Sequence, residues 1–333
     1  MYNMEQTLHE MIQKMSGDGF SLGERVVHIT LGNHARSHMY ICEPWKGMYL
    51  WANQIADIHL PYEGVLDGQL VTLNYCIDGR CEVEMPEHSY IYMEPGMLCI
   101  DSHEPKDGYS YPGKHYTGLE LALDLKRLGN HTMSELAALG VGDEWIKSRL
   151  KERNGTYLST VTENCAKLMS RIFSGLQNHD WRLEDYRFHV LWMLYELQHG
   201  ASVPMEDKVY VTKGQRQIAG EVEQMITANL ATHYTITDMA ERYGISASAL
   251  KKYFESVYGL PISYYLRQRR MELARKLLAE TRESVGTIAE ACGYINQGKF
   301  GVVFRECEGM TPLEYRRLFY HDRQKEESHA KTQ

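Results

Sequence analysis

A pattern repeated near the C-terminal end of the chain constrains its fold more than any other feature. The first copy contains Met239-Ala240-Glu241, Gly244, Leu250, Phe254, Gly259, Pro261 and Tyr265. The second copy contains Ile288-Ala289-Glu290, Gly293, Phe300, Phe304, Gly309, Pro312 and Tyr315. In both copies an alanine precedes a glycine by four residues, and a phenylalanine precedes another glycine by five. This order predicts a helix, a glycine-containing turn and a second helix, present twice.

The first copy carries local signals for the ends of both of its helices. Thr235 or Thr237 is expected to cap the first helix and Ser246 the second, because hydroxyl oxygens accept hydrogen bonds from free amides of the first turn. Gly244 is expected to adopt the left-handed turn conformation. The outer face of the second helix is a candidate DNA-binding surface: Ser246, Ala247, Ser248, Lys251 and Lys252.

The second copy has an outer face that is better equipped to read bases. Its candidate DNA-binding residues are Asn296, Gln297, Gly298, Lys299, Val302 and Arg305. Asn and Gln side chains can pair with adenine, Lys can reach guanine, and a Val methyl group can contact thymine. Arg316 and Arg317, beyond Pro312, are expected to contact phosphates and add affinity without sequence preference. We therefore expect specificity in the second copy and backbone positioning in the first.

A continuous helical pattern joins the two copies. Ile262 to Leu278 is uninterrupted by glycine or proline and predicts a helix roughly 25 Å long. Such a spacer suits two recognition helices about one turn of DNA apart, roughly 34 Å. Arg270, within this helix, is expected to be a structural ion-pair partner and not a base reader.

Taken together, these motifs resemble the AraC/XylS family of bacterial transcription regulators over residues 211–320. The resemblance rests most strongly on Cys292-Gly293-Tyr294, Asn296-Gln297, Gly309-Met310-Thr311-Pro312 and Tyr315-Arg316. It implies an all-helical module with two helix-turn-helix units, double-stranded promoter DNA and RNA polymerase as partners, and activation more often than repression. Gly298-Lys299 and Gly301-Val302 depart from the family pattern, so the base preference does not carry over.

Charge is distributed unevenly between the two parts of the chain. Residues 1–204 contain 17 Lys and Arg against 27 Asp and Glu, whereas residues 205–333 contain 19 against 17. The C-terminal part is therefore slightly basic within a chain of net charge −8. The seven cysteines form no CxxC pair, and no long apolar run or secretory signal is present. We expect a cytoplasmic protein that is not an enzyme, with no membrane association, cofactor, metal or catalytic residues.

In the N-terminal part of the sequence, apolar and polar residues alternate as they do in the strands of a β-rich domain. Short strands are expected between residues 51 and 125, with a hairpin at Asp78-Gly79 and a turn at Pro95-Gly96. This pattern predicts a sandwich or small barrel, and the family resemblance implies a cupin-like β-barrel at about residues 20–125. The fold class is then α+β and multidomain.

Helices are expected from about residue 133 to 198. Apolar stripes recur at helical spacing through Cys165, Leu168, Met169, Ile172 and Leu176, and through Leu183, Tyr186, Val190, Leu194 and Leu197. Two interpretations stay open. The stripes pack on the β-domain, or the helices of residues 162–198 form the seam of a homodimer.

The β-domain is the expected site for an unknown small-molecule effector. Candidate pocket residues combine apolar faces with polar tips: Trp51, Tyr75, Cys99, Tyr111, His115 and Tyr116. The sequence has no His-x-His pair, so His103 and His115 are not expected to bind metal. The acidity of residues 1–204 favours a neutral or cationic ligand.

The predicted organisation has four parts. Residues 1–200 sense an effector and dimerise, 201–212 form a linker, 213–320 bind DNA, and 321–333 are a disordered tail. The predicted function is a sequence-specific, effector-responsive transcription activator. One alternative is a metal-dependent cupin enzyme fused to a DNA-binding module, which elemental analysis tests. Another is a regulator controlled by a protein partner at the 162–198 helices, with an empty barrel.

Overall fold

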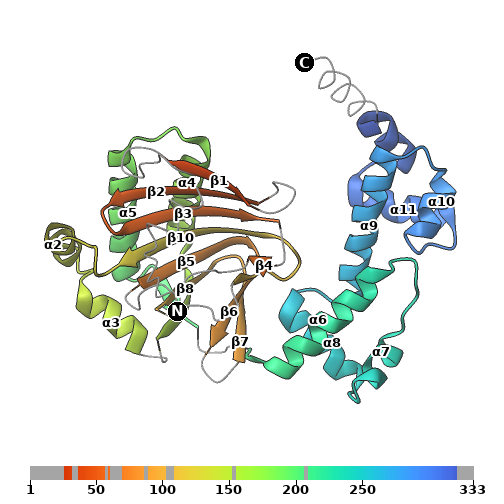
Figure 1. Cartoon of the computed structure of the whole chain (residues 1–333), viewed down its shortest axis with the longest axis horizontal. Coiled ribbons are helices and arrows are strands. Elements are labelled where there is room, and N and C mark those ends of the chain that lie inside the picture. The colour runs from red at the N-terminus through yellow and green to blue at the C-terminus, as the bar shows by residue number, and fades with distance from the viewer. Residues whose placement is uncertain are drawn as a thin grey trace, which may run out of the picture. The chain divides into compact units, whose positions relative to one another are not determined.

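The computed structural model describes residues 26–31, 37–56, 59–60, 70–85, 89–102, 109–151, 155–205 and 209–320. The chain divides into two units, residues 1–210 and 211–333, and each is described by itself (Figure 1). The predictions for His103 and for a disordered tail at 321–333 concern residues outside the described ranges.

An eight-stranded antiparallel sheet forms the centre of the N-terminal unit. Across the sheet the strands are β1 (Val27–Leu31), β2 (Ser37–Trp45), β3 (Met48–Ile55), β10 (Tyr116–Asp124), β5 (Leu70–Gly79), β8 (Met97–Asp101), β11 (Thr156–Val161) and β12 (Ser202–Pro204). Most of these strands are rich in β-branched and aromatic residues, which fit a pleated surface. The prediction of a β-rich N-terminal domain is confirmed.

The sheet is open in the part of the chain that the structure describes. β1 and β12 each have a single neighbour, so the ladder does not close into a ring. The prediction of a cupin-like β-barrel is therefore not confirmed. The prediction of helices over about residues 133–198 misses the strand β11, in which residues 156–160 pair with β8. β12 likewise places an edge strand within the predicted linker.

In a second sheet, β6 (Cys81–Met85) pairs antiparallel with β7 (Ser89–Met93). The predicted hairpin at Asp78-Gly79 is wrong. Both residues belong to β5 and pair with Thr117 and Tyr116 of β10, while β6 pairs with β7 instead of returning along β5. A two-residue pair, β4 (His59–Leu60) and β9 (Tyr109–Ser110), completes the strands.

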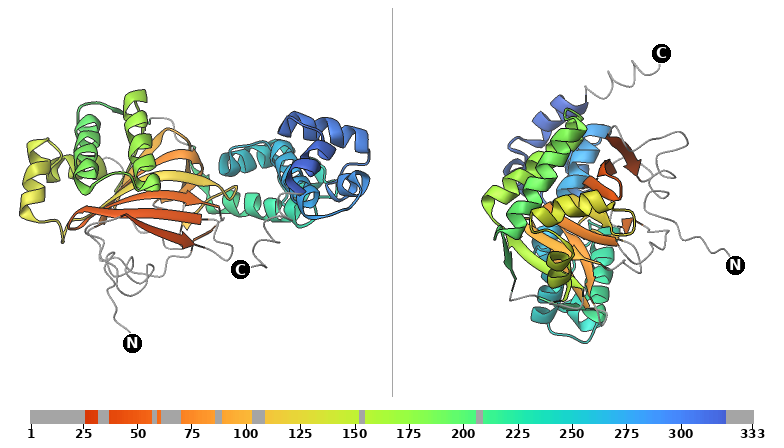
Figure 2. Two further views of the ribbon diagram at one scale, coloured as in Figure 1. Left: turned by 90° about the horizontal axis from the view of Figure 1, so that it is seen from above. Right: turned by 90° about the vertical axis from the view of Figure 1, so that its left-hand side faces the viewer.

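Two long helices cover one face of the sheet. They are α4 (Glu163–Asn178) and α5 (Leu183–Gln198), and both views in Figure 2 show them on the same side. Their buried residues share a core with alternate residues of the strands, such as Leu50, Leu73 and Leu121. The predicted apolar stripes thus pack on the sheet. α2 (Asn130–Ala138) and α3 (Asp143–Lys151) precede β11.

The C-terminal unit is helical, as predicted. After the short extended segment β13 (Val211–Thr212), its helices are α6 (Lys213–Ala228), α7 (Ile236–Arg242), α8 (Ala247–Tyr258), α9 (Ile262–Glu280), α10 (Val285–Ala291) and α11 (Gln297–Glu308), and residues 312–320 are also helical. α9 is the predicted bridging helix, two residues longer than expected. No helix among the described residues is long and apolar enough to cross a membrane.

Candidate nucleic-acid interface

The first helix-turn-helix, α7 and α8, has the turn chemistry that its sequence predicts. Thr235 Oγ1 accepts a hydrogen bond from the Asp238 amide at 3.1 Å and caps α7. Ser246 Oγ accepts from the Ala249 amide at 3.1 Å and caps α8. Between the helices, Gly244 has φ of +63°, the left-handed conformation that glycine adopts without a steric cost. The direction in which α8 leaves the turn is therefore fixed locally.

The second helix-turn-helix, α10 and α11, repeats this geometry. Ser284 Oγ accepts from the Thr287 amide at 3.0 Å and caps α10. Gly293 has φ of +75°. Asn296 caps α11, because its Oδ1 accepts from the amides of Gly298 at 2.7 Å and Lys299 at 3.2 Å. This amide oxygen is occupied in the free protein, which leaves Asn296 Nδ2 as the group available to a base.

The residues shared by the two copies form their cores. Phe254 and Tyr265 meet edge to face with ring centroids 5.3 Å apart, and Phe304 and Tyr315 do the same at 5.4 Å. Such pairs stabilise by about 0.5–1.5 kcal/mol beyond the area they bury. The repeated positions are thus scaffold residues that orient α8 and α11.

Arg270 of α9 is structural, although its partners differ from the predicted ion pair. Its Nε donates to the Leu230 carbonyl at 2.9 Å and its guanidinium donates to the Thr232 carbonyl at 3.3 Å. The side chain also lies against Gly293, where an added methyl group would come within 2.5 Å of both the guanidinium and the Leu230 oxygen. Arg270 thus ties the loop after α6 to the turn of the second helix-turn-helix.

Most of the candidate DNA-contacting side chains are exposed. In the first unit Ser246, Ser248, Lys251 and Lys252 are exposed and Ala247 is half-buried; in the second Asn296, Gln297, Gly298, Lys299, Val302 and Arg305 are exposed. Among the described residues, no carboxylate pairs with Lys251, Lys252 or Lys299. These ammonium groups are available to phosphates or base edges without breaking an internal ion pair.

Arg316 and Arg317 differ in their surroundings. The Arg316 guanidinium is half-buried and donates to the Glu283 carbonyl at 2.6 Å, at the start of α10. Arg317 is exposed. Arg316 therefore stabilises the loop before the second unit, and Arg317 is the better candidate for a phosphate contact.

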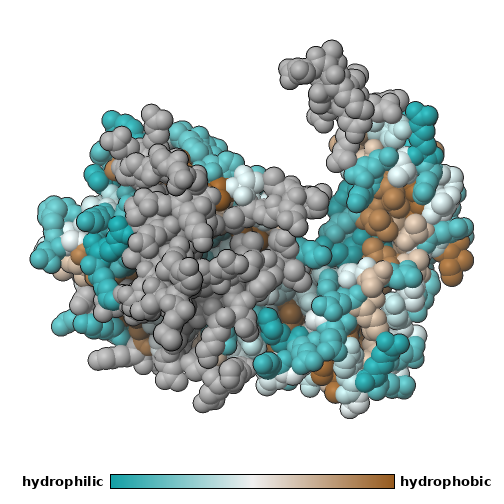
Figure 3. Space-filling model, viewed as in Figure 1, coloured by the Kyte–Doolittle hydropathy of each residue, from teal (hydrophilic) through white to brown (hydrophobic). Residues whose placement is uncertain are grey.

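Sequence reasoning missed Ile295, which directly precedes the cap of α11 and is 92 % exposed. A single exposed apolar residue is common on protein surfaces, so its place beside α11 is what makes Ile295 a candidate contact. Val302, one of the predicted contacts, is also exposed. Apolar surface also gathers over α9 and α11 in the view of Figure 3. The signal in the sequence was an isoleucine placed between the turn and the polar cap, outside the repeated core positions.

The six candidate effector residues of the N-terminal unit do not share one site. Trp51, Cys99, Tyr111 and Tyr116 are buried in clusters on the sheet face opposite α4 and α5. Tyr111 and Tyr116 stack with ring centroids 5.1 Å apart. Four of the six are therefore compatible with a site on this face.

The other two candidates lie elsewhere. Tyr75 belongs to the core beneath the helices, because neighbouring residues of a strand point to opposite faces. His115 is exposed, and its Nε2 lies 2.6 Å from Asp78 Oδ2. This contact and the adjacent hydrogen bonds lower the pKa of Asp78. His115 is a surface residue of the β5–β10 end and not a pocket residue.

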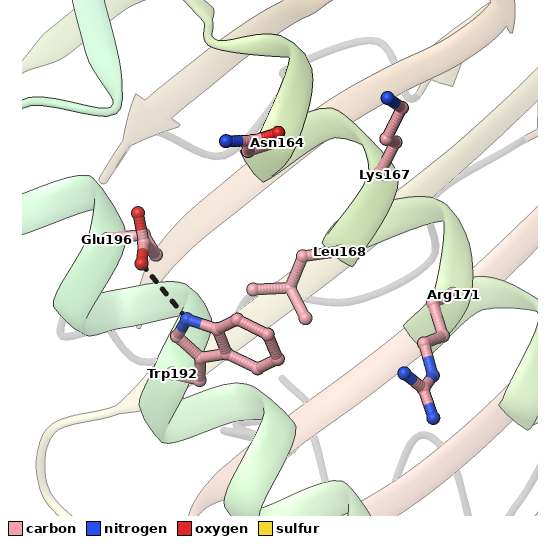
Figure 4. A pocket seen from close by; sticks show the side chains of 6 residues that line it. All are labelled: Asn164, Lys167, Leu168, Arg171, Trp192 and Glu196. Carbon is pink, nitrogen blue, oxygen red and sulfur yellow. Dashed lines mark hydrogen bonds between the residues drawn. The ribbon is translucent and has the colours of Figure 1, made fainter.

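A shallow groove of about 310 Å³ lies between α4 and α5 on their outer side (Figure 4). Leu168 and Trp192 form its apolar floor, and Lys167 and Arg171 lie along its α4 side. The Trp192 indole donates to Glu196 at 3.0 Å. The groove combines an aromatic surface with two cations, and it was not predicted from the sequence.

Comparison with known proteins agrees with the geometry of the C-terminal unit. A family model described as a helix-turn-helix domain matches residues 239–318. Over 94 residues the chain is 32 % identical to the HTH-type transcriptional activator RhaR of Pectobacterium carotovorum. The aligned stretch is 28 % of this chain and 33 % of that protein. RhaR of Klebsiella pneumoniae is 35 % identical over 91 residues, 27 % of this chain and 32 % of that protein. A DNA-binding transcriptional dual regulator from Escherichia coli K-12 has 32 % identity, covering 31 % of this chain and 95 % of that chain, with a TM-score of 0.27.

The repeated turn geometry and these sequence matches define the C-terminal unit as a helix-turn-helix DNA-binding domain. More particularly, the chain carries a domain of the AraC/XylS family of transcription regulators. The chain spans about a third of the length of the curated relatives that it matches, and the match lies in this domain.

Proposed function

We propose that the chain is a transcription activator that binds double-stranded promoter DNA through α8 and α11 and acts on RNA polymerase. The observation that carries this proposal is the paired helix-turn-helix geometry with an exposed cationic and amide-bearing face on α11. The relatives that match this domain include proteins described as transcriptional activators. Lys299 and Gln297 are the proposed base readers, and Lys251, Lys252 and Arg317 the proposed phosphate contacts.

In vitro selection from a random double-stranded library, followed by footprinting with the full chain, tests the proposal. We expect a protected site of roughly 17–20 base pairs, because two recognition helices read successive major-groove segments. Affinity should fall steeply with salt, by a log–log slope of about −0.9 for each phosphate neutralised. A library that yields no enriched sequence would contradict it.

Two substitutions separate specificity from affinity. Lys299→Ala should weaken binding to the selected site by about 1–3 kcal/mol and relax the base preference there. Arg317→Ala should weaken binding to all DNA sequences alike and reduce the log–log slope of affinity against salt by about one. Lys126→Ala, which removes an exposed charge from the N-terminal unit, is the matched control and should change neither. Identical effects of the first two variants would contradict the assigned roles.

We also propose that the N-terminal unit binds a small-molecule effector and mediates homodimerisation. Asn53 and Glu120, polar side chains buried on the sheet face opposite α4 and α5, support the first part. Exposed aromatic residues on the outer side of α5 support the second: Phe188, Trp192 and Tyr195. Elemental analysis of the purified chain tests the alternative of a metal-dependent enzyme. Stoichiometric iron, manganese or zinc would favour that alternative.

A further inference from the structure

A band of polar side chains, Asn53, Asn74 and Glu120 with the indole of Trp51, crosses the middle of the sheet face opposite α4 and α5. Cross-strand register places Glu120 of β10 between Trp51 of β3 and Asn74 of β5. Asn53, two residues along β3, lies on the same face, and its amide nitrogen is 3.5 Å from a Glu120 oxygen. Apolar clusters lie on both sides of the band, one containing Ile41 and Tyr49 and the other Cys99. The band therefore occupies a position where a folded core normally has apolar residues.

Two polar atoms of this band are buried without a hydrogen-bond partner in the described part of the chain. They are the indole nitrogen of Trp51 and the amide oxygen of Asn53. These side chains are only 7 % and 4 % exposed. A buried polar group without a partner loses its hydrogen bonds to water and gains none in return. An unused donor and an unused acceptor on the same face of β3 need partners that the described residues do not supply, and a ligand can supply them.

Neighbouring positions on β10 fix the side chain of Asn74 at one end of the band. Tyr116 folds across Gly118, where an added methyl group would lie 2.1 Å from the tyrosine oxygen. This lets the Tyr116 hydroxyl donate to Asn74 Oδ1. Asn74 is thus already engaged, whereas Trp51 Nε1 and Asn53 Oδ1 are left for another molecule.

Glu120 gives the band its chemical character. Its side chain is 6 % exposed, and no Lys or Arg among the described residues forms an ion pair with it. Burial raises the pKa of Glu120 to about 8, with Asp101 of β8 as the second cause and the Asn53 hydrogen bond opposing them. Tyr116 and Cys81 are the other titratable groups coupled to it. A buried carboxyl group of this kind has a strong preference for a cationic partner.

We propose that this band is the effector site of the N-terminal unit and that its ligand is a small amine. An ammonium group pairs with Glu120 and donates to Asn53 Oδ1, and a hydroxyl or carbonyl oxygen of the ligand accepts from Trp51 Nε1. The inference rests on the proposed function only in taking the N-terminal unit as effector-binding. DNA binding by α8 and α11 does not depend on it.

Calorimetric titration of the full chain with matched probes tests the ligand class. The probes are glucosamine against glucose and ethanolamine against ethylene glycol, at pH 7 in two buffers of different ionisation enthalpy. We expect an amine to bind at least about tenfold more tightly than its neutral partner. Binding should release part of a proton, because a carboxyl group whose pKa lies above 7 is mostly protonated at pH 7 and ionises when the ammonium binds.

Three variants identify the residues. Glu120→Gln should weaken amine binding at least about tenfold and abolish proton release. Trp51→Phe keeps an aromatic side chain but removes the indole N–H, so it should weaken binding but keep the proton release. This variant tests the site if Glu120→Gln does not fold. Glu163→Gln, at an exposed carboxyl of α4, is the control. The inference is overturned by no binding of either amine, by equal binding of an amine and its neutral partner, or by proton release that persists in Glu120→Gln. Footprinting of the same samples reports separately on the DNA-binding proposal.

Discussion

Among single residues, Glu120 couples the stability of the N-terminal unit to pH. Its pKa rises from 4.5 to about 8 in the folded chain because burial disfavours the charged form. Between these values the folded state binds a proton that the unfolded state has lost. The contribution of Glu120 to the free energy of unfolding should therefore be fully present below pH 4.5 and fall as pH rises towards 8, by up to about 1.4 kcal/mol per pH unit.

Urea unfolding between pH 5 and 8, followed by tryptophan fluorescence, measures this slope. All five tryptophans lie in residues 1–210, so the signal reports on the N-terminal unit alone. Glu120→Gln should flatten the dependence, and Glu163→Gln should keep it. A flat profile in the unsubstituted chain would mean that Glu120 is ionised and paired in the folded state.

At the scale of elements, the two turn glycines differ although the sequence presents them as equivalent. Both have positive φ, so alanine costs roughly 1–2 kcal/mol at either turn. A methyl group at Gly244 meets no atom within 4 Å, but at Gly293 it meets the Leu230 oxygen and the Arg270 guanidinium at 2.5 Å. Gly293→Ala should thus cost roughly 1–3 kcal/mol more than Gly244→Ala.

Far-ultraviolet circular dichroism during urea unfolding compares the two variants. The C-terminal unit contains no tryptophan, so its loss should appear in ellipticity while the fluorescence transition stays in place. Equal destabilisation by the two substitutions would mean that Leu230 and Arg270 move aside without cost.

The elements also show which predictions the sequence supports. The caps at Thr235 and Ser246 and the turn at Gly244 depend on neighbours within a few residues, and all three were predictable. The Asp78-Gly79 hairpin failed because strand pairing is non-local: β10 competes for the same edge of β5. Glu120 was missed for a related reason. Residues 117–123 contain one acidic residue, Glu120, among mostly apolar ones, but only the register places it beside Trp51 and Asn74.

At the scale of the whole molecule, the exposed aromatic residues on the outer side of α5 predict that the chain forms a homodimer. Phe188, Trp192 and Tyr195 are spaced by four and three residues, so they share one side of the helix, and Phe188 is 63 % exposed. The opposite side of α5 is already buried against the sheet. These aromatic groups are therefore free to pack against a second copy. In a dimer, two DNA-binding domains are linked, and the second binding event becomes intramolecular.

Sedimentation and DNA binding together test this assembly. The double substitution Phe188→Ser and Trp192→Ser should shift the chain from dimer to monomer. It should leave affinity for DNA with one selected site unchanged and weaken binding to two adjacent sites by roughly 10²-fold or more, because the gain from linkage is lost. Val203→Ser, at another exposed apolar residue of the same unit, should alter neither measurement. If the unsubstituted chain sediments as a monomer at micromolar concentration and binds two sites independently, the outer side of α5 is not a dimer interface. The groove between α4 and α5, which Trp192 also lines, would then be the surface to test against protein partners.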